Sequence, residues 1–100
     1  MKRTIRVTIE KELTIELMPS VLGEMTEAEY LAAFCKDLWK VESMDDVIRH
    51  AARVAADGGM GYEHDGIGLV DSHFSTHPRM PDVKVWEISE DIETEIIESA

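Results

Sequence analysis

The sequence predicts a single α+β domain that spans residues 1–100. Three observations lead to this fold class: strict alternation of apolar and polar residues near the N-terminus, two capped helical patterns, and short β-branched runs in the last third. The expected order β-α-α-β-β-β favours two helices packed on one face of a mainly antiparallel sheet. One hundred residues suffice for one modest core.

The first expected element is a long strand over residues 4–17. Its odd positions are apolar (Ile5, Val7, Ile9, Leu13, Ile15 and Leu17), and its even positions are charged or carry hydroxyl groups. This period of two predicts a half-buried strand. Only Lys11 interrupts the apolar side, where a bend is expected. No glycine or asparagine is placed to make a tight hairpin turn there.

Two helices follow. Thr26 and Glu29 have the spacing of a capping box, which predicts a helix over 26–41. Ser43 predicts the start of a second helix over 44–57, which Gly58 would end. The single cysteine, Cys35, excludes an internal disulfide and is expected to be a small buried hydrophobe in the first helix.

The remaining third reads as short strands at 67–70, 83–88 and 92–97. Apolar residues on both faces of 83–88 predict an interior strand that is covered on two sides. A turn is expected at residues 89–91, which would join the last two strands.

A histidine-rich segment, residues 62–78, raises the question of metal binding or catalysis. Asp71 and His73 are two residues apart, so on a strand they would share a face, with His64 and His77 nearby. However, the segment has no recognised metal spacing and no nucleophile-elbow motif. The sequence therefore predicts no catalytic residue, no metal and no cofactor. A small metal-dependent enzyme or metal-binding protein built on these four residues is the alternative hypothesis.

Charge is the strongest global feature, because the formal net charge is −11. The last fourteen residues, "EISEDIETEIIESA", contain six acids and no base. Such a field repels phosphate, which argues against direct binding of nucleic acid, and it attracts a basic protein surface. The predicted function is therefore a protein–protein interaction module. The expected partner-binding residues are Glu87, Glu90, Asp91, Glu93, Glu95 and Glu98, together with Tyr62, Glu63, Asp65 and Phe74 in the polar loops.

The opening "MKRTIRVTIEKELTIEL", the short length and the acidic end "VWEISEDIETEIIE" resemble the small acidic proteins of phages and mobile elements, including anti-CRISPR inhibitors. The resemblance covers about a third of the chain. It implies stoichiometric binding that blocks a basic, nucleic-acid-binding surface, such as that of a CRISPR effector complex. The group shares no fold or motif, so no functional residue is carried over. The bases Lys2, Arg3, Arg6 and Lys11 imply that any mimicry of phosphate is confined to one face.

Two further expectations concern location and assembly. No apolar run approaches the ~20 residues that cross a bilayer, and the N-terminus lacks the apolar stretch of a signal peptide. A cytoplasmic protein without membrane contact is therefore expected, in the host cell if the chain is phage-encoded. A homodimer could form through an exposed edge of the first or last strand. A structural or assembly subunit, whose acidity serves solubility, is a third hypothesis.

Overall fold

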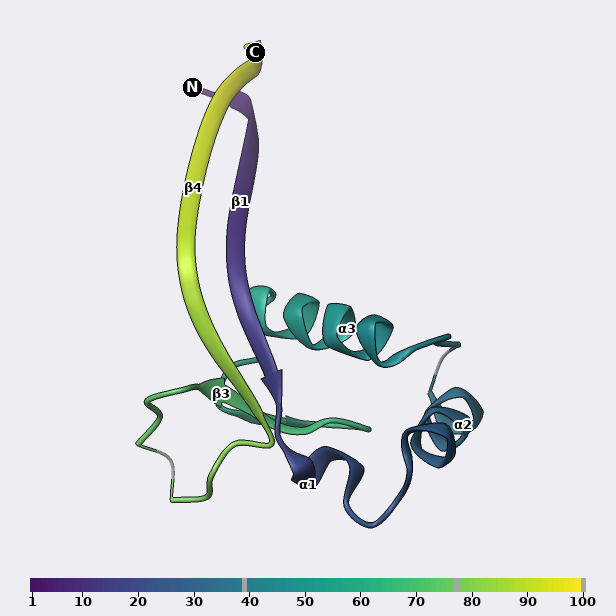
Figure 1. Cartoon of the computed structure of the whole chain (residues 1–100). Helices are drawn as coiled ribbons and strands as arrows, with labels where there is room; N and C mark the ends of the chain where they lie inside the picture. The colour runs from purple at the N-terminus through teal and green to yellow at the C-terminus, as the bar shows by residue number, and fades with distance from the viewer. Residues whose placement is uncertain (39, 77, 100) are drawn as a thin grey trace.

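Two long antiparallel strands, β1 (Arg3–Leu17) and β4 (Val83–Ser99), dominate the computed structural model, which describes residues 1–38, 40–76 and 78–99. They pair from one end to the other (Figure 1). The strictly alternating pattern of the first seventeen residues therefore forms one long strand, as the sequence predicts.

The other elements form a small body at one end of these strands. They are α1 (Pro19–Leu22), α2 (Glu27–Asp37), α3 (Met44–Ala56), β2 (Tyr62–His64) and β3 (Gly68–Ser72). The sheet order is β1-β4-β3-β2, with β3 parallel to β4 and the other two pairs antiparallel. The predicted α+β class with a mainly antiparallel sheet is confirmed.

The last third of the chain differs from the sequence prediction. The strands expected at 83–88 and 92–97 are one continuous strand, and the expected turn at residues 89–91 is wrong. The register instead shifts by one residue opposite Glu12 and Leu13, so that Ile88 forms a β-bulge. A bulge breaks the period of two as a turn does, without reversing the chain. The short elements α1 and β2 were not predicted.

Both predicted helix starts are confirmed. The Glu29 amide donates to the Thr26 hydroxyl (3.2 Å), and the Thr26 amide donates to the Glu29 carboxylate (3.1 Å). The Ser43 hydroxyl accepts a bond from the Asp46 amide (3.4 Å). Helix α2 ends at Asp37, four residues before the expected end.

The core lies between the sheet and the helices. Tyr30 and Phe34 of α2 pack with the buried face of α3, with Ile67 in the turn before β3, and with the sheet residues Val70, Val83 and Val85. Leu13, Ile15 and Leu17 of β1 are half-buried against this cluster. The helices therefore cover the odd-numbered face of β1, but only along its C-terminal third.

Cys35 is exposed, so the expectation that it is buried is wrong. It lies in α2 outside the Tyr30–Phe34 stripe. Its thiol donates to the Val41 carbonyl (3.2 Å) and its sulfur accepts from the Val41 amide (3.3 Å). The thiol thereby joins α2 to the segment that leads into α3.

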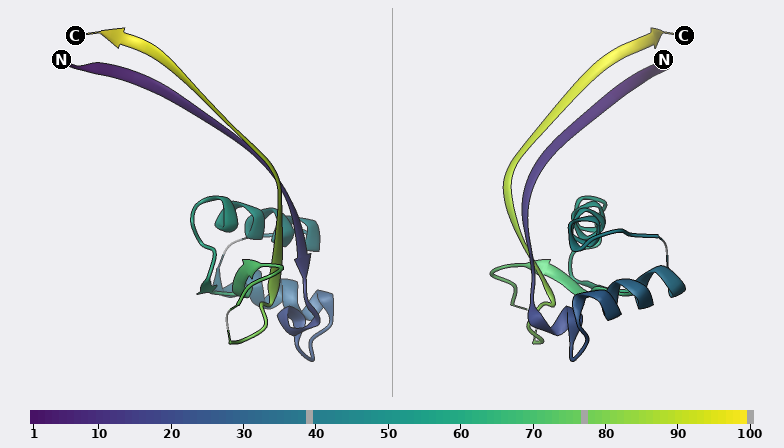
Figure 2. Two further views of the ribbon diagram at one scale, coloured as in Figure 1. Left: turned by 90° about the vertical axis from the view of Figure 1, so that its left-hand side faces the viewer. Right: turned by 45° about the vertical axis from the view of Figure 1, so that its right-hand side comes forward.

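Much of β1 and β4 projects beyond the body. The molecule measures 57 × 32 × 20 Å, and its radius of gyration is 17.0 Å, against ~13 Å for a compact domain of this length. Figure 2 shows both strands extending beyond the helices and curving as they leave the body. The bulge at Ile88 lies opposite Glu12 and Leu13, immediately after Lys11, where a bend is expected from the sequence.

Asp82 connects the base of β4 to the rest of the body. It is buried (8% exposed), and its carboxylate accepts bonds from the Ser20 hydroxyl (2.6 Å), the Leu69 amide (2.8 Å) and the Arg79 guanidinium (2.9 Å). Its own amide donates to the Leu69 carbonyl (2.9 Å). A side chain at Gly68 would lie 2.2 Å from the carboxylate, and Gly68 has a φ of +83°, so glycine is required there.

These contacts control the ionisation of Asp82. Burial alone would raise its pKa, but the bonds from Ser20, Leu69 and Arg79 outweigh burial and lower the pKa below the ordinary 3.8. Because the folded pKa is depressed, the stabilisation is present above the unfolded pKa and is lost as the pH falls through the folded pKa.

We predict that Asp82→Asn lowers the free energy of unfolding by about 2–4 kcal/mol at neutral pH, because an amide cannot accept all three bonds. The matched control, Asp65→Asn at an exposed turn, should change it by less than about 0.5 kcal/mol. Urea denaturation at pH 7 and at pH 3 measures both. The gap between wild type and Asp82→Asn should narrow at pH 3, and an equal gap at both pH values would contradict this role of the carboxylate.

Candidate interaction site

The part of the two long strands that projects from the body is the most unusual surface of the molecule. We call it the arm, defined as residues 3–12 of β1 and 88–99 of β4. Every residue of the arm is exposed. Both termini lie at the tip of the arm, far from the body (Figure 1). The two strands are therefore connected through the body and not by a turn at the tip.

One side of the arm is acidic. Residues that pair directly across an antiparallel ladder point to the same side of the sheet, so the register assigns each side chain to a face. The even positions of β1 share a face with their partners on β4. We call this the acidic face, and its carboxylates are Glu10, Glu12, Asp91, Glu93, Glu95 and Glu98.

A single base lies on the acidic face. Arg6 pairs across the ladder with Glu95 at 3.4 Å, and both side chains are more than 60% exposed. Such an ion pair contributes little to stability, because water screens both charges. The ion pair nevertheless agrees with the register, which places Arg6 and Glu95 on the same face.

The opposite side of the arm is apolar. We call it the apolar face; from the tip inward it consists of Ile5 with Ile96, Val7 with Thr94, and Ile9 with Ile92. The five aliphatic side chains are 44–62% exposed. Lys11 and Glu90 form an ion pair (3.7 Å) at the base of this face.

A second one-residue shift, at Ile97 near the tip, keeps Glu98 on the acidic face, and the bulge at Ile88 produces the rest of this separation. Without the one-residue shift at Ile88, Asp91, Glu93 and Glu95 would have the same parity as the core residues Val83 and Val85 and would lie on the apolar side of β1. The shift moves these three acids to the other face. Ile92 and Ile96 then lie opposite the isoleucines of β1.

The acidic face has a charge spacing near that of a nucleic acid strand. Successive same-face residues of a strand are about 6.7 Å apart, so its five rungs span about 27 Å. Six carboxylates over this length give about one charge per 5 Å, against about one per 3.4 Å for the phosphates of one strand. Glu10 and Asp91 pair directly across the ladder, on the fourth of the five rungs counted from the tip.

The ten partner-binding residues predicted from sequence do not form one surface. Four of them, Asp91, Glu93, Glu95 and Glu98, lie on the acidic face, whereas Glu87 and Glu90 have the parity of the apolar side. The sequence prediction missed Glu10 and Glu12. The alternation of the first strand places Glu10 and Glu12 on its polar side. That this side joins the acids of β4 depends on the pairing of residues far apart in the sequence, which the alternation does not specify.

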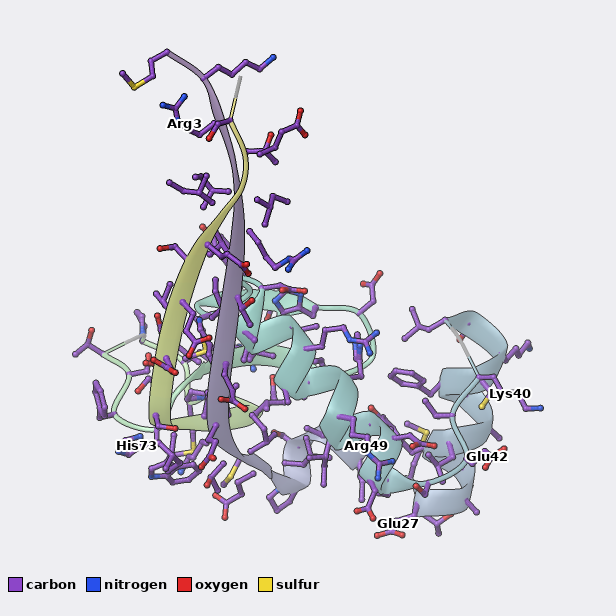
Figure 3. The ribbon with its side chains drawn as sticks, turned by 90° about the horizontal axis from the view of Figure 1, so that it is seen from above. Arg3, Glu27, Lys40, Glu42, Arg49 and His73 are labelled. Atoms are coloured by element: carbon purple, nitrogen blue, oxygen red, sulfur yellow. The ribbon has the colours of Figure 1, made fainter. Side chains whose placement is uncertain are left out.

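The four predicted loop residues lie on the body. Tyr62 (67% exposed) and Glu63 are in β2, Asp65 is in the turn that follows, and Phe74 (74% exposed) is in the loop after β3. Glu63 forms an ion pair with Arg79. Arg3 lies at the far tip of the arm from the loop that holds His73 (Figure 3). The loop residues and the acidic face are therefore separate surfaces.

The candidate metal ligands have partners within the protein. A ring nitrogen of His64 lies 2.8 Å from the Gly59 carbonyl, and Asp71 accepts bonds from the Ser72 amide and the Ser75 hydroxyl. His73 stacks on Trp86 with ring centroids 4.8 Å apart. Outside residues 39, 77 and 100, no three His, Cys, Asp or Glu side chains are grouped so that they could hold a metal ion. His77 lies outside the described residues.

A group of bases lies on the body beside α3. Lys40, Arg49 and Arg53 line a hollow of about 540 Å³ beside α3, together with His50. Burial, followed by the positive charge of Arg53, lowers the pKa of His50, and its ring packs edge-on against Phe34. Arg49 is also paired with Asp46 (2.7 Å), which reduces the net positive charge of this surface.

No protein-family model, no curated protein and no solved structure matches this chain. Among the described residues, no helix has both the length and the apolar character needed to cross a membrane.

We predict that chelation leaves the melting temperature of the protein unchanged, because the described candidate ligands are bonded internally. Differential scanning fluorimetry with and without EDTA, together with elemental analysis of the purified protein, measures this. Stoichiometric zinc, manganese or nickel, with a melting temperature several degrees lower in EDTA, would contradict the prediction and support the metal hypothesis.

Proposed function

We propose that the chain is a protein-binding module whose acidic face occupies a basic surface that otherwise holds nucleic acid. The observation that carries this proposal is the segregation of six carboxylates onto one face of a projecting ribbon. A partner groove that accepts a phosphate backbone presents lysines and arginines at intervals suited to such a row.

The shape of the arm supports this mode of binding. A two-stranded ribbon is narrow, and all of its acidic face is exposed, so it can enter a groove that a globular surface could not reach. The carboxylates project from a hydrogen-bonded ladder, which fixes their spacing before binding and reduces the entropy that binding must offset. The charge of −11 would also speed association with a basic partner.

The target class follows from the resemblance to small acidic phage inhibitors. We propose stoichiometric inhibition of the anti-CRISPR type, in which the arm blocks target recognition by a CRISPR effector complex. The activity would take place in the cytoplasm, for which the single exposed Cys35 and the absence of disulfides argue. Nucleic acid itself is not bound in this proposal.

The test compares two triple variants that carry the same change in net charge. Glu10→Gln, Asp91→Asn and Glu93→Gln together neutralise the centre of the acidic face. Glu24→Gln, Asp37→Asn and Glu42→Gln neutralise exposed acids of the body and serve as the control. Each protein would be tagged, immobilised and incubated with the heparin-binding fraction of a bacterial lysate at ~50 and ~200 mM salt. The basic proteins retained by each of the three would then be compared.

We predict that wild type and the body control retain the same basic proteins at low salt, and that the arm variant loses them. The association rate for any partner identified should fall at least ~10-fold in the arm variant, with little change in unfolding free energy. An added DNA duplex should compete with the chain for the partner. Equal retention by all three proteins, or binding that DNA does not affect, would contradict the proposal.

A further inference from the structure

We propose that the apolar face of the arm packs against the apolar face of a second copy of this chain, so that two arms form a two-layer sheet around a two-fold axis. The proposal concerns the face opposite the one used in the proposed function and does not depend on it. The edge-to-edge dimer expected from the sequence is a different arrangement.

The apolar face continues a surface that is covered in the body. On β1, Leu13, Ile15 and Leu17 pack against the core under the helices, and beyond Lys11 the residues Ile9, Val7 and Ile5 extend the same row outward. Both strands extend beyond helices α1, α2 and α3 (Figure 2), and Ile5, Val7 and Ile9 are exposed in the described structure. A continuous row of exposed aliphatic side chains on a small protein is typical of an interaction site.

The exposed area matches what a dimer needs. The chain exposes 7216 Å², about 1,500 Å² more than the ~5,700 Å² expected for a compact monomer of its mass. A standard interface covers about 800 Å² on each partner. Face-to-face packing of two arms would therefore remove a large part of the excess.

The charges along this side of the arm favour an antiparallel second copy. The residues at the centre of the apolar face are all uncharged: Ile5, Val7 and Ile9 on β1, and Ile92, Thr94 and Ile96 on β4. Arg3 has the same parity at the tip (Figure 3), whereas Glu87 and Glu90 lie at the base with Lys11. A two-fold axis near Val7 places the Arg3 of each copy beside the base acids of the other.

The same arrangement keeps the remaining negative charge apart. The six carboxylates of each acidic face would point outward from the two-layer sheet, on opposite sides of the dimer. Two chains of charge −11 would thus meet through faces whose centres carry no charge. The proposed dimer would also stabilise the arm, because a two-stranded ribbon without a second layer is only marginally stable in water.

The test uses adjacent residues that lie on opposite faces. Val7→Asp places a carboxylate near the proposed axis, and Thr8→Asp places the same group on the acidic face. Sedimentation equilibrium should give wild type and Thr8→Asp twice the chain mass of 11.3 kDa. Val7→Asp should raise the dimer dissociation constant ~100-fold or more, because each dimer would bury two unpaired carboxylates.

A second measurement covers the case in which Val7→Asp unfolds the arm. In a Cys35→Ser background, Val7→Cys should form a disulfide-linked dimer under mild oxidation, as opposed residues of two packed sheets can. Thr8→Cys should not. A wild-type monomer at ~100 µM would overturn the proposal. So would a dimer that only Thr8→Asp dissociates, or equal cross-linking of the two cysteine variants.

Discussion

The pairing of β1 with β4, with its bulge at Ile88 and a further one-residue shift at Ile97, is the constraint on which the rest of the molecule depends. Near the body, the ladder places Val83 and Val85 beside Leu17 and Ile15, which closes the core. Beyond the bulge, the same ladder gives the arm one apolar and one acidic face. The bulge therefore lets one strand serve both a buried core and a two-faced exposed ribbon, and the shift at Ile97 keeps Glu98 on the acidic face.

Local patterns in the sequence were sufficient for much of this fold. The alternation from Ile5 to Leu17 predicted β1, and the caps at Thr26 and Ser43 predicted where two helices begin, because both signals depend on neighbouring residues. The sequence predicts a turn at residues 89–91 where the structure has a bulge at Ile88, because a turn and a bulge both interrupt the period of two. The register of β1 with β4 joins residues more than 65 positions apart, so the acidic face as a unit was not visible in the sequence.

The body acts mainly as the anchor of the arm. Asp82 ties the first residues of β4 to β3 and to α1, and the hydrogen bond from the Met18 amide to the Asp82 carbonyl (2.8 Å) ties them to the end of β1. Both strands are thereby held at the base, and among the described residues the other elements bury them only there. The two proposed uses of the arm are compatible, because a partner on the acidic face and a second copy on the apolar face do not compete for the same side chains.

The central claim is that the bulge register separates acids from aliphatic residues along the arm. Cross-strand disulfide formation in a Cys35→Ser background tests it most directly, because a disulfide requires Cα atoms about 4.4–6.8 Å apart and side chains on the same face. The account predicts that Thr8→Cys with Glu93→Cys forms an intramolecular disulfide, and that Thr8→Cys with Ile92→Cys does not. The reverse result would mean that the strands continue without the shift, and that acids and isoleucines are mixed on both faces.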